Sequence, residues 1–333
     1  MRDSRSSTDR VVSAQRLRQH VEALAVGPRS DRHARAGMQA AREYVTEHLQ
    51  AAGWVTREQP VEVSGRWGLS DDPTGWRMWW PFVHHSHVLG TNVLAEREAN
   101  NTRPPLVIAA HLDTVQASPG ADDNASGVAV LLELATVLSA TDVPVLLAVL
   151  DLEEIGQFGA KALAQQLRAG RGATGMVALD AVGYYTDTVG SQQIPFGAGA
   201  GMPTVVKHAR ANGRRGDFAV VIHRRSSRAL AEQWCAAAAA HSSGLVGVPL
   251  ADPRPEGWLG RLVTFLLPAT SNLDRSDHAP FWRAKVPAVL ISDTASFRGG
   301  HYHRPTDTPD TLDYERLAGV AEATRALAVS LRR

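Results

Sequence analysis

The chain has 333 residues, of which 44% are hydrophobic, and its formal net charge is +1. This length and hydrophobicity suffice for a sizeable core. The near-zero charge gives no electrostatic reason to expect nucleic acid or an anionic membrane as a partner. A single cysteine, Cys235, excludes an internal disulfide.

Residues 1–13 are charged and polar, and we expect a flexible N-terminus there. This segment has no apolar core, so it does not resemble a secretory signal. No apolar stretch of the chain reaches the roughly 18–20 residues of a membrane span. These patterns predict a cytoplasmic protein.

Helical and strand-like patterns alternate along the first half of the chain. Strands are expected at 54–64, 91–96, 105–111 and 143–151, and helices within 14–53 and at 127–140 and 159–170. Residues 65–90 hold four tryptophans (Trp67, Trp76, Trp79, Trp80) and the tract HHSH, and we expect an irregular stretch there.

The second half continues in the same way, without an internal repeat or a clear linker. We expect a strand at 176–180, turns at 181–203, a helix at 203–213, a strand at 217–224, a helix at 226–243, and further elements at 261–267, 287–293 and 314–331. The alternation predicts an α/β fold with a mostly parallel central sheet and helices on both faces, a three-layer α/β/α arrangement. We therefore expect one domain over 14–333.

Charged side chains follow three of the apolar runs. His111 ends LVIAAH, Glu153 and Glu154 follow VLLAVLDL, and Asp180 ends GMVALD. In open α/β sheets, ligands bind outside the carboxyl ends of the strands. Histidine and carboxylate without cysteine suit a catalytic divalent metal such as zinc. We therefore expect a metal site at this edge of the sheet.

The segment HLDTV places His111 and Asp113 two residues apart, on one face of an extended chain. The imidazole can bind a metal while the Asp113 carboxylate orients a ligand. The alternative is a histidine that is only hydrogen-bonded to a nearby aspartate. In GADDNASG, capping of the next helix explains one polar residue, but not the adjacent pair Asp122 and Asp123. A carboxylate here can bridge two metal ions.

In DLEEIG, neighbouring side chains at a strand end point in different directions. Glu154 can therefore bind a metal while Glu153 faces the open coordination position and transfers protons. The alternative is an acidic helix N-terminus, which the helix dipole favours. Asp180 alone could merely begin a turn.

Three histidines lie in the C-terminal loops, and spacing alone does not choose a ligand among His278, His301 and His303. The tract HHSH at 84–87 has no carboxylate partner nearby, and we expect a loop or rim there.

Taken in order, these motifs resemble peptidase family M28, the zinc aminopeptidases. The series is HLD, GADDNASG, EE followed by a glycine, LD, SDHAPF and YHRPTDTPDTL, and it covers roughly residues 14–331. The resemblance implies a zinc-exopeptidase fold with two zinc ions. The implied ligands are His111, Asp123 and Asp180 for one ion and Asp123, Glu154 and His303 for the other.

The resemblance also implies a bridging role for Asp123, an orienting role for Asp113, a general base at Glu153 and a cis Asp123–Asn124 peptide. The implied reaction is hydrolysis of the N-terminal bond of a peptide or small amide by a metal-activated water. A glutaminyl cyclase, with one zinc, and a non-catalytic binding protein on the same scaffold are the alternatives. Side-chain preference and oligomeric state do not follow from the sequence.

Overall fold

The computed structural model describes residues 11–72, 82–98, 102–195, 198–242, 244–266 and 268–331. Its centre is one eight-stranded sheet in the order β1-β2-β4-β3-β5-β8-β6-β7. The pairs β3–β4, β3–β5, β5–β8 and β6–β7 are parallel, and β1–β2, β2–β4 and β6–β8 are antiparallel. The predicted mostly parallel α/β sheet is confirmed.

The strands are β1 Val55–Leu69, β2 Phe82–Glu96, β3 Leu106–His111, β4 Val145–Leu150, β5 Gly175–Leu179, β6 Phe218–His223, β7 Val246–Ala251 and β8 Ala288–Ser292. The helices are α1 Ala14–Leu24, α2 Arg35–Ala51, α3 Gly127–Val137, α4 Phe158–Ala169, α5 Ala198–Gly201, α6 Pro203–Ala211, α7 Arg228–His241, α8 Trp258–Leu266, α9 His278–Arg283 and α10 Tyr314–Ser330.

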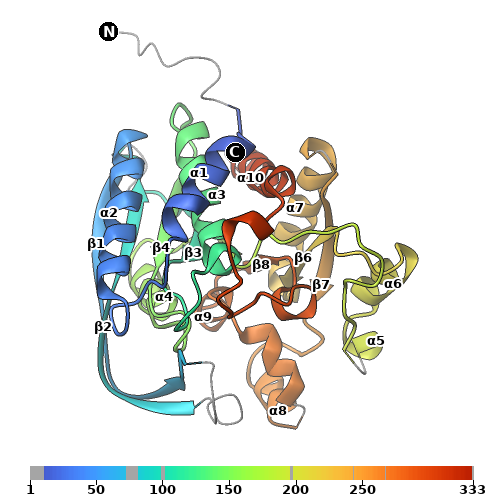
Figure 1. Cartoon of the computed structure of the whole chain (residues 1–333). Coiled ribbons are helices and arrows are strands. Elements are labelled where there is room, and N and C mark those ends of the chain that lie inside the picture. The colour runs from blue at the N-terminus through green and yellow to red at the C-terminus, as the bar shows by residue number, and fades with distance from the viewer. Residues whose placement is uncertain are drawn as a thin grey trace.

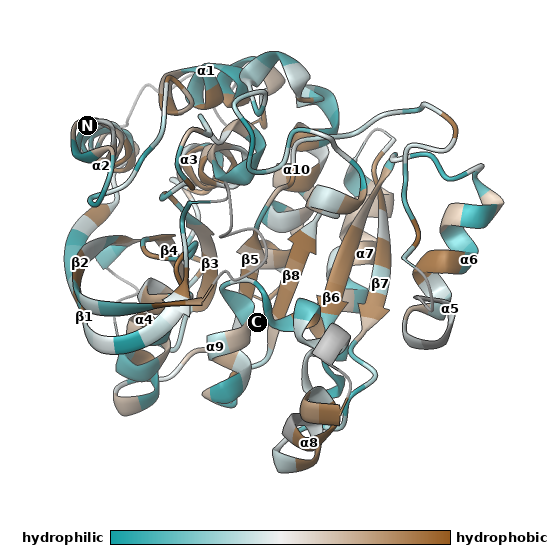
Figure 2. Ribbon diagram, turned by 60° about the horizontal axis from the view of Figure 1, so that its bottom comes forward, coloured by the Kyte–Doolittle hydropathy of each residue, from teal (hydrophilic) through white to brown (hydrophobic). Residues whose placement is uncertain are grey.

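Every residue of the four central strands β3, β4, β5 and β8 is buried. They are nearly continuous runs of Val, Leu, Ile and Ala, as expected for strands that are covered on both faces. Helices α1, α2, α3, α7 and α10 share a hydrophobic core with one face, and α4 and α9 pack on the other (Figures 1 and 2). This arrangement gives the three predicted layers.

The described part of the N-terminus is fixed as far as residue 11. The Ser13 hydroxyl accepts a hydrogen bond from the Arg16 amide and so caps α1. Glu133, fully buried on α3, accepts from the Ser13 amide at 2.7 Å and pairs with the Arg16 guanidinium at 2.6 Å. Ser13 therefore does not belong to a flexible segment as predicted, and residues 1–10 lie outside the described residues.

The prediction of an irregular stretch over 65–90 is wrong for most of that range. Strands β1 and β2 form a long antiparallel hairpin in which Trp67 lies opposite His84. Figure 1 shows the far end of the hairpin running past the central strands and bending toward the middle of the view. Cross-strand backbone hydrogen bonds need no apolar alternation, so an exposed hairpin of this kind gives little sequence signal. Residues 73–81, with Trp76, Trp79 and Trp80, lie outside the described residues.

The hairpin is attached to the loop that follows β4. The Leu69 amide donates to the Ile155 carbonyl at 3.0 Å, and His85 Nε2 lies 3.0 Å from the Leu69 carbonyl oxygen. In the HHSH tract, His85 is therefore a buried part of strand β2 that contacts the end of β1. Strand β7 gives no clear strand pattern in the sequence, because it is an edge strand interrupted by Pro249.

Within the described ranges, no helix combines the length and the apolar character needed to cross a lipid bilayer.

Candidate metal centre

The residues predicted as metal ligands come together beyond the carboxyl ends of the central strands. His111 ends β3, Glu154 and Asp180 follow β4 and β5, Asp123 lies in the loop before α3, and His303 lies in the loop after β8. Ligand atoms of His111, Asp123 and Asp180 lie within 4.8 Å of one another, and so do those of Asp123, Glu154 and His303. Parallel strands bring residues far apart in sequence to one edge of the sheet.

The Asp123 carboxylate connects the two groups, one oxygen to each. Its Oδ1 lies 3.1 Å from His111 Nε2, and its Oδ2 lies 3.1 Å from His303 Nε2. Asp180 Oδ1 is 3.5 Å from His111 Nε2, and Glu154 Oε2 is 3.2 Å from His303 Nε2. One carboxylate therefore lies within reach of both groups of candidate ligands.

The chemistry of the donors fits zinc. The Nε2 atoms of His111 and His303 and the Oε1 atom of Glu154 are buried, and none of them has a neighbour in hydrogen-bond geometry, although both Nε2 atoms lie 3.1 Å from an Asp123 oxygen. Buried polar atoms in folded proteins are nearly always satisfied, so three unsatisfied atoms in one place call for a ligand. Two imidazole nitrogens among carboxylate oxygens form a donor set that zinc prefers.

The charges at the site also indicate that it binds a cation. Burial lowers the pKa of His303, but the carboxylates of Glu154 and Asp123 outweigh it and raise the pKa to about 10. The pKa of His111 is likewise raised despite burial, because Asp123 and Asp180 lie beside it. The site thus has the negative potential that attracts a cation.

Asp113 contacts both the His111 imidazole and the backbone of the Glu153–Glu154 loop. Its carboxylate oxygens accept hydrogen bonds from the amides of Glu153 and Glu154, each at 3.1 Å. His111 Nδ1 lies 3.0 Å from the Asp113 backbone carbonyl oxygen, nearer than the 3.7 Å to its carboxylate. The imidazole is therefore oriented by the backbone of Asp113, while its side chain orients the glutamate loop.

Glu153 is buried, and it lies near enough to His111, Asp180 and Glu154 for their charges to act on its pKa. Burial is the main cause that raises its pKa well above the usual carboxyl range, and the charges of Asp277 and Asp180 add to it. A carboxyl group with a raised pKa can both accept and return a proton near neutral pH.

The loop that carries Asp123 has an unusual backbone. The Asp123–Asn124 peptide is cis, which confirms that expectation. Gly120 adopts a φ of 61°, and a Cβ there would lie 2.4 Å from the Asp123 carbonyl oxygen, so only glycine fits. The Asp307 carboxylate accepts from the amides of Asp122 at 2.8 Å and Asp123 at 3.2 Å. Asp307 thereby fixes the backbone that carries the Asp123 carboxylate.

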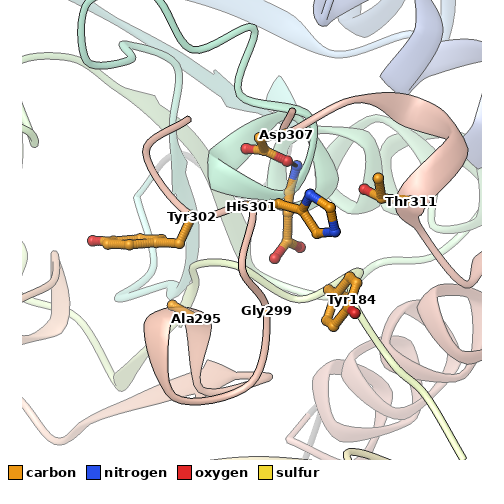
Figure 3. A pocket seen from close by; sticks show the side chains of 8 residues that line it. Tyr184, Ala295, Gly299, His301, Tyr302, Asp307 and Thr311 are labelled. Atoms are coloured by element: carbon orange, nitrogen blue, oxygen red, sulfur yellow. Dashed lines mark hydrogen bonds between the residues drawn. The ribbon is translucent and has the colours of Figure 1, made fainter. Parts of the chain in front are cut away.

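The structure also separates the three competing histidines. His303 lies among the carboxylates, whereas the His301 ring lies 5.6 Å from the Tyr184 ring, in a cavity also lined by Asp122, Asp307 and Thr311 (Figure 3). His278 is fully buried, and its Nε2 contacts the Leu273 carbonyl oxygen at 2.9 Å.

Sequence reasoning missed Arg29, which is 1% exposed. Its guanidinium donates to the carbonyls of Leu112, Leu24, Pro119 and Gly120, at 2.7–3.0 Å. Arg29 thereby joins the loop after His111 to the loop before Asp123. Burial lowers its pKa to about 10, so it stays charged at neutral pH beside the carboxylates. Its segment, GPRS, gives no signal beyond a turn between two helices.

Comparison with known proteins places the chain in a family. The sequence model of peptidase family M28 matches residues 92–216 and 263–328. The uncharacterized protein YfbL of Escherichia coli is 33% identical over 238 residues, which are 67% of this chain and 66% of that protein. The match thus leaves about a third of that relative without a counterpart.

Solved structures share the fold at low sequence identity. A zinc aminopeptidase from Bacillus subtilis superposes with a TM-score of 0.67 and 13% identity, over 96% of this chain and 95% of that one. A glutaminyl cyclase from Porphyromonas gingivalis superposes with a TM-score of 0.64 and 19% identity, over 96% and 99% of the two chains. The fold alone therefore does not distinguish these two activities.

Proposed function

The chain belongs to peptidase family M28, and from this premise we propose that it is a zinc-dependent aminopeptidase that hydrolyses the N-terminal bond of peptides. The observation that carries the proposal is the pair of ligand groups that share Asp123, with the buried Glu153 directly before Glu154 and near enough to His111 and Asp180 for their charges to act on it. We propose two zinc ions, one held by His111, Asp123 and Asp180 and the other by Asp123, Glu154 and His303.

Zinc held by these ligands would polarise the scissile carbonyl and lower the pKa of a neighbouring water molecule. Residues of the chain would carry out the proton transfers and hold the reacting groups in position. Glu153 would take a proton from the attacking water and deliver it to the departing amine. The Asp113 carboxylate would keep Glu153 in place by accepting a hydrogen bond from the Glu153 backbone amide. The cytoplasmic location remains a prediction.

A glutaminyl cyclase is the second candidate, because cyclase structures superpose on the chain as well as aminopeptidases do. Cyclisation needs a polarised amide and a proton carrier but no water, and one ion suffices. Two complete ligand groups around one shared carboxylate favour hydrolysis. A binding protein without catalysis is disfavoured by the same completeness.

One experiment separates the three. Zinc-loaded protein, with and without chelator, is incubated with free-amine, N-acetylated and N-terminal-Gln peptides, and the products are followed by mass spectrometry. We expect chelator-sensitive loss of single N-terminal residues from free-amine peptides only. Loss of ammonia from the Gln peptides alone would replace the peptidase by the cyclase. No product from any peptide would contradict both activities.

A further inference from the structure

Helix α8 turns its large apolar side chains to solvent. Trp258 is 71% exposed, Phe265 80% and Leu266 65%, and Leu259 and Leu262 are also among the exposed large hydrophobics. At about 100° per residue, these five fall within an arc of roughly 120° on the helix. A surface helix of a monomeric protein normally points such an apolar stripe toward the core, so this one is reversed.

The inward side of α8 is fixed by small and polar contacts. Arg254 Nη1 donates to the Thr264 hydroxyl at 2.9 Å. A Cβ at Gly260 would lie 2.1 Å from the Pro255 carbonyl oxygen, so α8 lies directly against the segment 252–255 that leads into it, and this segment is held in the protein through Arg254. Gly260 and Thr264 lie opposite the apolar stripe, and the stripe therefore cannot rotate inward without breaking both contacts.

The base of α8 is held by four charged residues that we call the Arg254 cluster: Arg224, Asp252, Arg254 and Asp274. Arg254 pairs with Asp252 at 2.8 Å and with Asp274 at 2.7 Å. Gln157 Nε2 donates to the Asp274 carbonyl at 2.7 Å, which ties this base to the loop that carries Glu153. The helix is thus a fixed projection (Figure 1) whose apolar face no described residue covers.

We propose that this face packs against α8 of a second copy of the chain, across a twofold axis. An apolar stripe is complementary to itself under twofold rotation, as a dimer interface requires. Trp258 and Phe265 are both mostly exposed, and aromatic side chains bury about 150–250 Å² each, which is a substantial share of the ~800 Å² per partner of a standard interface. The net charge of +1 leaves little repulsion between two copies.

A lipid surface is the other ligand to which an apolar helix face is suited. Helices that lie on membranes carry several Lys or Arg residues on the polar side that faces water and headgroups. The polar side of α8 faces the protein instead, through Gly260 and Thr264, and Arg261 is the only basic residue in the helix sequence. The second copy therefore fits these observations better than a bilayer does.

The test measures the mass of the full chain by light scattering after size exclusion, from 0.5 to 50 µM, alone and with phosphatidylcholine–phosphatidylglycerol vesicles. We expect a concentration-dependent dimer that does not bind vesicles. The double variant Leu262→Glu/Phe265→Glu should dissociate at least 100-fold more readily. The control Val26→Glu changes an 84%-exposed valine outside α8 and should leave the dimer intact.

A second variant keeps the test informative if the double variant misfolds. Leu262 lies near the middle of the stripe, so Leu262→Cys should form a disulfide between copies under mild oxidation. The native Cys235 should not react, because burial raises its thiol pKa to about 12. A wild-type monomer at 50 µM, vesicle binding by monomers, or a dimer unaffected by both glutamates would each overturn the proposal.

Discussion

The Arg254 cluster and the metal centre both contain buried charged side chains, but they differ in one respect. In the Arg254 cluster each carboxylate has guanidinium partners: Arg254 and Arg224 outweigh the effect of burial and lower the pKa of Asp252. In the metal centre, carboxylates face imidazoles, and buried nitrogen and oxygen atoms make no hydrogen bond. The first cluster satisfies itself, and the second is complete only with a cation. Buried polar atoms without hydrogen bonds, rather than buried charge as such, distinguish a ligand-binding site from a structural cluster of ion pairs.

The largest effect should come from Glu153, which belongs to the metal centre but to neither ligand group. Glu153→Gln should lower turnover by about two to four orders of magnitude, because the proton carrier is lost. Zinc content should stay unchanged, since the ligands remain. Steady-state kinetics and metal analysis measure both, with the exposed Glu232→Gln as control. Normal turnover in Glu153→Gln would contradict the assignment of the base.

The Arg254 cluster should show the reverse behaviour. Arg254→Met leaves Asp252 buried without its main partner, and should cost about 3–5 kcal/mol of unfolding free energy. Urea denaturation measures this loss, while zinc stoichiometry should not change. Arg254→Met/Asp252→Asn should recover part of the stability, because no uncompensated charge remains. Loss of zinc in the single variant would show that the two clusters are not separate.

Arg29 sharpens the comparison, because it is a buried cation that serves the metal centre without binding a carboxylate. Arg29→Met should weaken zinc binding by about 10–100-fold, as removal of outer contacts to metal ligands does. Competition with a chromogenic chelator measures the affinity, and Arg18→Met, on the exposed side of α1, is the control. Equal affinities in the two variants would mean that Arg29 only fastens loops.

The smallest expected effect concerns a buried histidine without carboxylates. Burial, with His48 and Arg16 nearby, lowers the pKa of His20 to about 4. The unfolded chain then binds a proton below about pH 6.5 that the folded chain refuses until about pH 4. Stability therefore falls as the pH falls through this window, by about 2 kcal/mol between pH 7.5 and 5.

Comparing the wild type with His20→Gln by urea denaturation at both pH values isolates this contribution. The variant should lose about 2 kcal/mol less stability than the wild type on acidification. An identical loss in both proteins would show that His20 does not stay neutral, and that burial alone does not govern this imidazole.

Much of the fold could be read from the sequence because burial leaves a pattern. The central strands are apolar runs, and the residues that end them, His111, Glu154 and Asp180, stand out as polar. The β1–β2 hairpin was missed because its stability comes from backbone pairing at an edge, and its side chains, such as Trp67, stay exposed. Sequence patterns therefore reveal strands that are buried, but not edge strands that are held mainly by backbone hydrogen bonds.

The sequence by itself determined the α/β class, the strand-end positions of most proposed ligands and, through resemblance, the family. Spacing alone did not choose among the histidines, the family resemblance implied His303, and the tertiary structure brings His303 among the carboxylates. Only the tertiary structure revealed Arg29 between two loops and the outward apolar face of α8. The physical reason is that periodicity and strand ends are local properties of the chain. Which side chains meet, and which face of a helix remains uncovered, depends on contacts between distant segments.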